Sequence, residues 1–105
     1  MTRVRVLLAD DHALFREGVA GILNSQPDFT VVGEAADGIE AVVMARKLRP
    51  DLILMDVGMP GYDGVEATQA IKRELPDTTV VMLTVREEDE MLFDAIKSGA
   101  QGYLL

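Results

Sequence analysis

Short apolar segments alternate along the chain with segments whose apolar residues recur at helical spacing. Five segments are predicted to be strands: residues 4–9, 29–35, 52–56, 79–84 and the start of a fifth at 102–105. The segments between them are long enough for helices of about 10–13 residues. A strand, a helix and a second strand form a right-handed βαβ unit, whose strands lie parallel in one sheet. The pattern therefore predicts an α/β fold with a parallel sheet.

Four helices are predicted between these strands. They end near Asn24, near Leu48, before Pro76 and at Gly99. Proline cannot continue a helix, and glycine is well suited to the position just after a helix ends.

Length and composition restrict the class of protein. A chain of 105 residues is expected to form one domain with one core. The absence of cysteine excludes disulfides and cysteine-based metal sites, and it favours a reducing cytoplasm. No signal-peptide pattern precedes the first strand, and no apolar run approaches the ~20 residues that span a bilayer. The net charge of −8 argues against nucleic-acid binding by this surface itself.

Polar residues follow three of the predicted strands. Asp10 and Asp11 follow the first, Asp56 ends the third, and Thr84 ends the fourth. Because ligands bind at the carboxyl ends of parallel strands, these groups are expected to meet at one edge of the sheet. Three carboxylates in one place repel one another unless a cation lies among them. Oxygen ligands without cysteine favour a hard cation such as Mg²⁺, which also takes phosphate oxygens as ligands.

Each of these residues, taken alone, has an ordinary structural interpretation. Asp11 or Asp56 could be a helix N-cap or a turn former, and Thr84 could simply end a strand. His12 is expected to face solvent from a loop and not to bind a metal. Four methionines are expected to pack in the core or in turns: Met55, Met59, Met82 and Met91. The conjunction of polar residues at three strand ends favours a functional site.

Four stretches of the sequence resemble the receiver domain of bacterial two-component response regulators. They are residues 8–12 (LADDH), 56–64 (DVGMPGYDG), 82–84 (MLT) and 95–105 (AIKSGAQGYLL). Their order and spacing cover nearly the whole chain and are most similar to the branch whose receivers precede a LuxR/NarL-type helix-turn-helix. The resemblance implies a flavodoxin-like, doubly wound parallel sheet with strand order 2-1-3-4-5.

The resemblance also implies a role for each site residue. Asp56 would be the phosphoacceptor, and Asp11 and Asp56 would bind Mg²⁺ directly with the backbone carbonyl of Gly58. Asp10 would act on the metal mainly through water. Thr84 would contact the phosphoryl group through its hydroxyl, and Tyr103 would be the aromatic residue that turns inward when Thr84 moves.

The implied activity is that of a regulator and not of a metabolic enzyme. The phosphoryl group would come from a sensor histidine kinase, and the domain would assist its own phosphorylation and dephosphorylation. Phosphorylation would switch a C-terminal DNA-binding domain, which these residues do not include, and would favour a homodimer. No membrane partner is expected.

The resemblance is incomplete at the C-terminal side. The family pattern continues with a lysine after Leu105 and with a fifth helix, so residues 1–105 are expected to form an incomplete receiver domain. The first helix would then cover one face of the sheet alone, leaving apolar side chains of the third to fifth strands exposed there. We expect such a chain to self-associate through that face or to fold poorly.

Two other functions match parts of the same pattern. A Mg²⁺-dependent aspartyl-phosphate hydrolase of the haloacid-dehalogenase type needs a second aspartate at the position of Gly58, and usually a cap insertion. A phosphorylation-independent dimerisation module would not need Asp10, Asp11, Asp56 and Thr84 together. Dinucleotide binding is disfavoured because no G-x-G-x-x-G follows the first strand.

Overall fold

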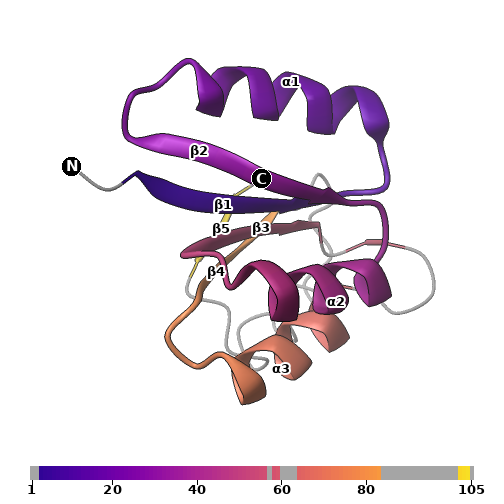
Figure 1. Cartoon of the computed structure of the whole chain (residues 1–105). Coiled ribbons are helices and arrows are strands. Elements are labelled where there is room, and N and C mark those ends of the chain that lie inside the picture. Colours follow the sequence, from indigo (N-terminus) through magenta and orange to yellow (C-terminus); the bar gives the residue numbers. More distant parts are fainter. Residues whose placement is uncertain (1–2, 57, 60–63, 84–101, 105) are drawn as a thin grey trace.

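The computed structural model describes residues 3–56, 58–59, 64–83 and 102–104 (Figure 1). Its helices and strands follow in the order β1 (Val4–Ala9), α1 (Ala13–Asn24), β2 (Phe29–Ala35), α2 (Gly38–Leu48), β3 (Leu52–Asp56), α3 (Gly64–Glu74), β4 (Thr79–Leu83) and β5 (Gly102–Leu104). The first three strands and first three helices agree with the prediction. The predicted fourth helix and Thr84, expected at the end of the fourth strand, lie outside the described residues.

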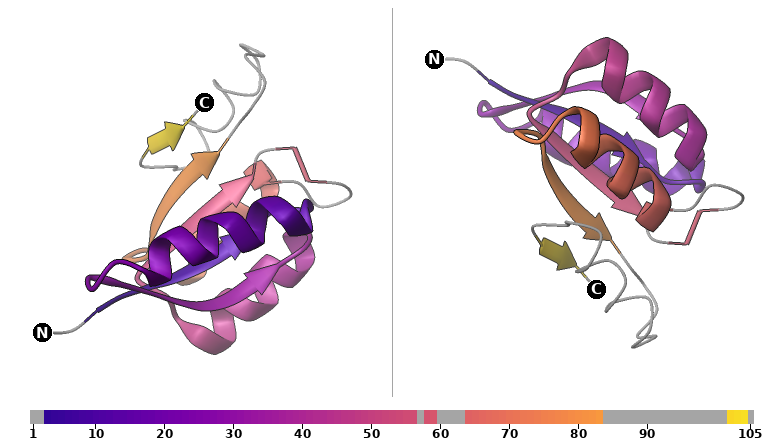
Figure 2. Two further views of the ribbon diagram at one scale, coloured as in Figure 1. Left: turned by 90° about the horizontal axis from the view of Figure 1, so that it is seen from above. Right: turned by 90° about the horizontal axis from the view of Figure 1, so that it is seen from below.

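The strands form one parallel sheet in the order β2-β1-β3-β4-β5. This is the predicted flavodoxin-like order. The strand order changes direction between β1 and β3, which makes this the topological switch point of the sheet. Two views of the ribbon show α1 on one face of the sheet and α2 with α3 on the other (Figures 1 and 2). Among the described residues, no helix is long and apolar enough to cross a membrane.

The core lies between the sheet and the helices α2 and α3. Alternate residues of β3 and β4 that face these helices are fully buried: Ile53, Met55, Val80 and Met82. Met59 also packs in this core, which confirms the packing predicted for three of the four methionines. Met91 lies outside the described residues.

The face of the sheet under α1 is less well covered. Leu14 and Ile22 of α1 are 84% and 66% exposed, and no residue of α1 is fully buried. Leu52, Leu54 and Val81 are only half-buried, although their neighbours on the opposite face are completely covered. The exposure expected for this face is therefore seen only in part, because these residues of β3 and β4 are half-buried; the side chains of β5 are not described.

Local sequence signals fix the path of the chain around α2. The Asp37 carboxylate accepts a hydrogen bond of 2.7 Å from the Glu40 amide, so Asp37 is the N-cap of this helix. At the other end, Arg49 has a left-handed backbone with φ of 47°, and Pro50 follows. Helix α2 therefore begins beside the carboxyl ends of β1 and β2 and ends at the opposite edge of the sheet.

Candidate functional site

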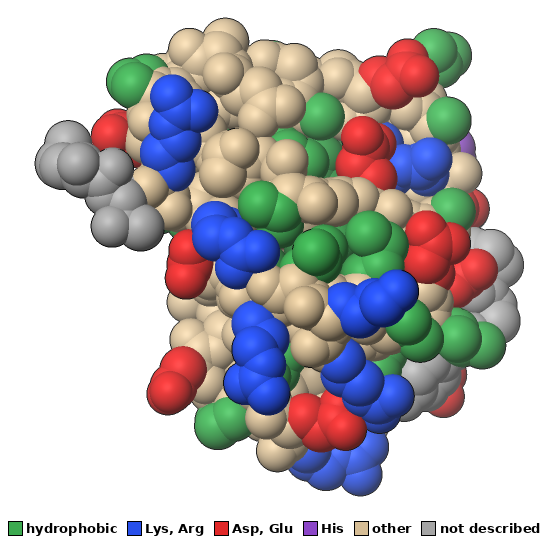
Figure 3. Space-filling view, viewed as in Figure 1, with side chains coloured by type: hydrophobic (Ala, Val, Ile, Leu, Met, Phe, Trp, Pro, Cys, Tyr) green, Lys and Arg blue, Asp and Glu red, His purple; other side chains and the backbone are tan. Residues whose placement is uncertain are grey.

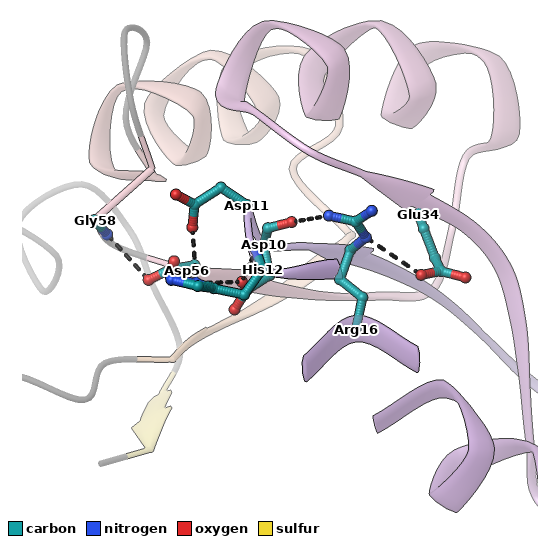
Figure 4. Close-up of polar contacts among 7 residues, drawn as sticks. All are labelled: Asp10, Asp11, His12, Arg16, Glu34, Asp56 and Gly58. Atoms are coloured by element: carbon teal, nitrogen blue, oxygen red, sulfur yellow. Dashed lines mark hydrogen bonds and ion pairs between the residues drawn. The ribbon is translucent and has the colours of Figure 1, made fainter. Parts of the chain in front are cut away.

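The register between β1 and β3 brings the predicted aspartates together. Ala9 pairs with Met55, so Asp10 and Asp56 are the next residues on neighbouring strands. Each of Asp10, Asp11, His12 and Asp56 offers one potential ligand atom, and these four atoms lie within 4.8 Å of one another. Figure 4 shows their side chains converging at this edge of the sheet. The structure thus places all three predicted carboxylates in one cluster.

Asp10 is the most buried member of the cluster, with 7% of its surface exposed. Its amide donates to the Ala35 carbonyl at 3.0 Å, which extends the pairing of β1 with β2 by one residue. Its Oδ1 accepts a hydrogen bond of 2.7 Å from the His12 amide. A carboxylate that accepts the amide two residues later closes a tight turn, so Asp10 shapes the start of α1.

Asp56 is half-buried, and its environment raises the pKa of its carboxyl group above the usual 3.8. Burial is the largest cause, because it removes water from the charged form. The amide of Gly58 donates to Oδ1 at 3.1 Å and acts in the opposite direction. The negative charges of Asp10 and Asp11 raise the pKa further, as does a hydrogen bond between the side chains of Asp11 and Asp56. The site therefore disfavours three ionised carboxylates.

Two groups of basic side chains lie too far from the three carboxylates to balance their negative charge. The last turn of α2 carries Arg46 and Lys47, and that of α3 carries Lys72 and Arg73. These residues lie at the edge of the sheet away from the site, where cations favour helix C-termini. Figure 3 shows Lys and Arg side chains gathered over α2 and α3. A cluster of carboxylate oxygens fits a hard divalent cation, so the cluster is chemically suited to Mg²⁺.

His12 is exposed, as predicted, with 73% of its side chain accessible. Its Nδ1 lies 3.2 Å from Oδ1 of Asp10 and 3.1 Å from Oδ1 of Asp11. These contacts were not anticipated from the sequence. His12 also occupies the N-cap position of α1, without a side-chain cap hydrogen bond, so the alternative that Asp11 caps this helix is wrong.

The turn-former interpretation of Asp56 is correct but does not exclude a functional role. Asp56 accepts the amide of Gly58, as Asp10 accepts that of His12. In both turns one carboxylate oxygen is held by the backbone of the loop. Because a carboxylate has two oxygens, a backbone hydrogen bond to one of them is compatible with a ligand on the other.

Two predicted site residues are not brought into the cluster by the described part of the chain. Thr84 lies outside the described residues. The backbone of Tyr103 pairs with Met82 in the sheet, but its side chain is not described. For Gly58 the amide is seen at Asp56, whereas the predicted contact of its carbonyl with a metal stays a prediction.

One residue at the site was missed by sequence reasoning. Arg16, in the first turns of α1, donates from Nη1 to the backbone carbonyl of Asp10 at 2.5 Å. Its Nε donates to Oε1 of Glu34 on β2 at 3.3 Å (Figure 4). The only signal available was an arginine one helical turn after His12, and that spacing does not reveal a partner on another strand.

Comparison with known proteins identifies the family. Residues 6–105 match the response regulator receiver domain, and the chain belongs to this family. It is 50% identical over 102 residues to the transcriptional regulatory protein LiaR of Bacillus subtilis, a match covering 97% of this chain and 48% of LiaR. A similar match, 48% identical over 102 residues, covers 97% of this chain and 49% of the response regulator protein VraR of Staphylococcus epidermidis.

Solved structures agree with this family. The signal receiver domain of NarL from Mycobacterium tuberculosis has a TM-score of 0.94 and 38% identity, and the match covers 100% of this chain and 85% of that one. The relatives are of the LuxR/NarL type, as the sequence predicted. The chain spans about half the length of the curated relatives it matches.

Proposed function

We propose that this chain accepts a phosphoryl group on Asp56 from a sensor histidine kinase, with Mg²⁺ bound at the acidic cluster. The observation that carries the proposal is the convergence of Asp10, Asp11 and Asp56 within one receiver-family chain, at the edge where two neighbouring strands end. The half-buried Asp56 lies close to both of the other carboxylates.

In the proposed reaction a carboxylate oxygen of Asp56 attacks the phosphorus of a phosphorylated histidine. A P–O bond forms as the P–N bond to the imidazole breaks, and the leaving nitrogen keeps the electron pair and takes a proton from solvent. The product is an acyl phosphate on Asp56. The amide of Gly58 holds one oxygen of the Asp56 carboxylate, which orients the attacking group.

The metal ligands in this proposal are Asp11 and Asp56, with Asp10 acting through water and Gly58 through its carbonyl. A bound Mg²⁺ would neutralise negative charge on the carboxylates and on the phosphoryl oxygens. The fixed turns at Asp10 and Asp56 keep the carboxylates close enough to share one cation. Both the amide and the carboxylate of Asp10 have backbone partners, Ala35 and His12.

The output of the phosphorylated domain is also part of the proposal. The phosphoryl oxygens would draw the hydroxyl of Thr84 toward Asp56, and the ring of Tyr103 would turn into the space that is vacated. This is a shift between two packings of one fold. The full-length protein would then regulate transcription through a DNA-binding domain, and phosphorylation would favour a homodimer. The named function of LiaR, a transcriptional regulatory protein, supports this output.

The test is labelling with acetyl phosphate, a small phosphoryl donor, followed by intact-mass spectrometry. We expect one added phosphoryl group in the presence of Mg²⁺ and none in EDTA. Asp56→Asn should abolish the label, whereas Asp37→Asn should retain it, because Asp37 caps α2 and asparagine is an equally good N-cap. Equal labelling of the Asp56→Asn variant would overturn the assignment of Asp56.

A further inference from the structure

Arg16 links three parts of the chain at the acidic cluster. Its Nη1 donates to the backbone carbonyl of Asp10 at 2.5 Å, and its Nε donates to Oε1 of Glu34 at 3.3 Å. Only 18% of its side chain is exposed. Arg16 also lines a small apolar hollow with Leu8, Val19 and Leu54. The guanidinium is therefore held by two hydrogen-bond partners, the Asp10 carbonyl and Glu34.

The hydrogen bond to the Asp10 carbonyl constrains Asp11 as well. This carbonyl belongs to the peptide unit that joins Asp10 to Asp11, and a peptide unit is planar. Fixing its oxygen therefore fixes the direction in which the chain enters Asp11. The amide of Asp10 is already held by Ala35, so the peptide units on both sides of Asp10 are fixed.

Glu34 determines the orientation of the guanidinium. Glu34 lies on β2 and pairs with Leu8 of β1. The next pair along the two strands is Ala35 with Ala9, so Glu34 lies near the carboxyl end of β1. The contact is an ion pair as well as a hydrogen bond, and it balances the charge of Arg16. A guanidinium presents several N–H donors in a rigid plane, so one side chain can serve the carbonyl and Glu34 together. A lysine ammonium lacks this planar arrangement.

We propose that Arg16, oriented by Glu34, is a positioning residue that sets the geometry of Asp10 and Asp11 for binding a divalent cation. This inference rests on the proposed function, because it concerns the same metal site. Arg16 touches neither the cation nor Asp56 in this scheme; it acts through the Asp10–Asp11 peptide. Groups that orient metal ligands commonly change metal affinity by roughly 10–100-fold when they are removed.

The sign of the effect separates positioning from simple electrostatics. A positive charge near a cation site repels the cation, so electrostatics alone predicts that Arg16→Met binds Mg²⁺ more tightly. Positioning predicts weaker binding for the same variant. Arg16→Lys keeps the charge and removes the planar pair of donors, so electrostatics predicts no change and positioning predicts a loss.

The experiment measures the dissociation constant for Mg²⁺ by following backbone amide signals of the 105-residue chain during titration, at a protein concentration where sedimentation gives the same association state for every variant. The same spectra report whether each variant is folded. We expect Arg16→Lys and Arg16→Met to raise the dissociation constant by roughly tenfold. The matched control is Arg46→Lys, since Arg46 pairs with Glu74 at 2.6 Å at the edge of the sheet away from the site. Its dissociation constant should stay within about twofold of the unaltered chain.

Thermal midpoints in EDTA distinguish a structural role from positioning. If Arg16 only ties α1 to the sheet, Arg16→Lys lowers the midpoint and leaves the dissociation constant unchanged, which would overturn the inference. Tighter binding by Arg16→Met would also overturn it. If the unaltered chain itself binds Mg²⁺ no better than Asp11→Ala does, the proposed metal site is wrong and the inference falls with it. Binding by the unaltered chain with no loss in Arg16→Lys refutes the inference alone.

Discussion

Replacing Asp56 with asparagine should make the metal-free protein more stable at neutral pH. Asparagine keeps an oxygen that accepts the Gly58 amide, so the turn is preserved while one negative charge is removed. The remaining carboxylates of Asp10 and Asp11 then lose a repelling neighbour. Stabilisation by loss of a functional group is expected where a site concentrates like charges for a purpose other than folding.

The size of the effect follows from the geometry of the cluster. Two unit charges 4.8 Å apart repel by about 3.5 kcal/mol at an effective dielectric of 20 and by about 0.9 kcal/mol in bulk water. Asp56 is half-buried and the site opens to solvent, so the value for this pocket lies nearer the lower limit. We expect Asp56→Asn to raise the free energy of unfolding by about 1–2 kcal/mol, with a rise in Tm of roughly 4–8 °C per kcal/mol.

The pH dependence of this gain has a defined direction. The folded protein binds the proton of Asp56 more tightly than the unfolded chain does, because the pKa of Asp56 is raised above 3.8. Below about pH 3.8 the Asp56 carboxyl group is protonated in both the folded and the unfolded state, so its ionisation does not lower the free energy of unfolding. The destabilisation develops as the pH rises through the raised pKa of the folded state, and it is constant above that value. The advantage of Asp56→Asn should grow over the same window.

The assay is thermal unfolding in EDTA at several pH values, followed by circular dichroism. Asp37→Asn is the control for a generic aspartate-to-asparagine change, and it should leave the midpoint nearly unchanged. An Asp56→Asn midpoint equal to or below that of the unaltered protein at pH 7 would refute the account of the cluster as a site of unrelieved repulsion.

Four further results are expected. Mg²⁺ at millimolar concentration should raise the melting midpoint of the unaltered chain. Asp11→Ala should raise the metal-free midpoint and weaken the response to Mg²⁺. A metal-free midpoint of Asp11→Ala below that of the unaltered chain would mean that Asp11 has a structural role. Gly33→Val should cost no more than about 1 kcal/mol, measured by urea unfolding, because the Cβ would lie 2.6 Å from the terminal methyl of Met44, which can move aside. On phosphorylation, changes in amide chemical shifts should concentrate between Thr84 and Tyr103, and changes confined to α1 would contradict the proposed switch. Sedimentation of the 105-residue chain should detect self-association through the half-buried apolar face under α1, and a stable monomer would contradict this expectation.

The sequence predicted the fold well because each signal was local and strong. Apolar runs bounded by turn residues marked the strands, and the bounds of β1, β2 and β3 agree with the structure. The Asp37-Gly38 and Arg49-Pro50 pairs marked both ends of α2. The strand order came from the resemblance to receiver domains, since periodicity alone does not specify which strands are neighbours.

The site was predicted in part for a similar reason. The carboxylates of Asp10, Asp11 and Asp56 could be brought together because parallel strands end at one edge. The contacts of His12 and Arg16 could not be predicted, since they depend on the direction of side chains in the first turn of α1. The pairing of Arg16 with Glu34 joins residues 18 positions apart on different elements, and no spacing rule indicates such a contact.

The central claim, that Asp56 carries the phosphoryl group, is tested most directly by locating the label within the chain. After treatment with acetyl phosphate and Mg²⁺, borohydride reduction converts an aspartyl phosphate to homoserine, which peptide mass spectrometry places at a single residue. We expect homoserine at position 56 and unmodified aspartate at positions 10 and 11. Homoserine at position 10 or 11, or none at position 56 in a chain that has gained a phosphoryl group, would contradict it.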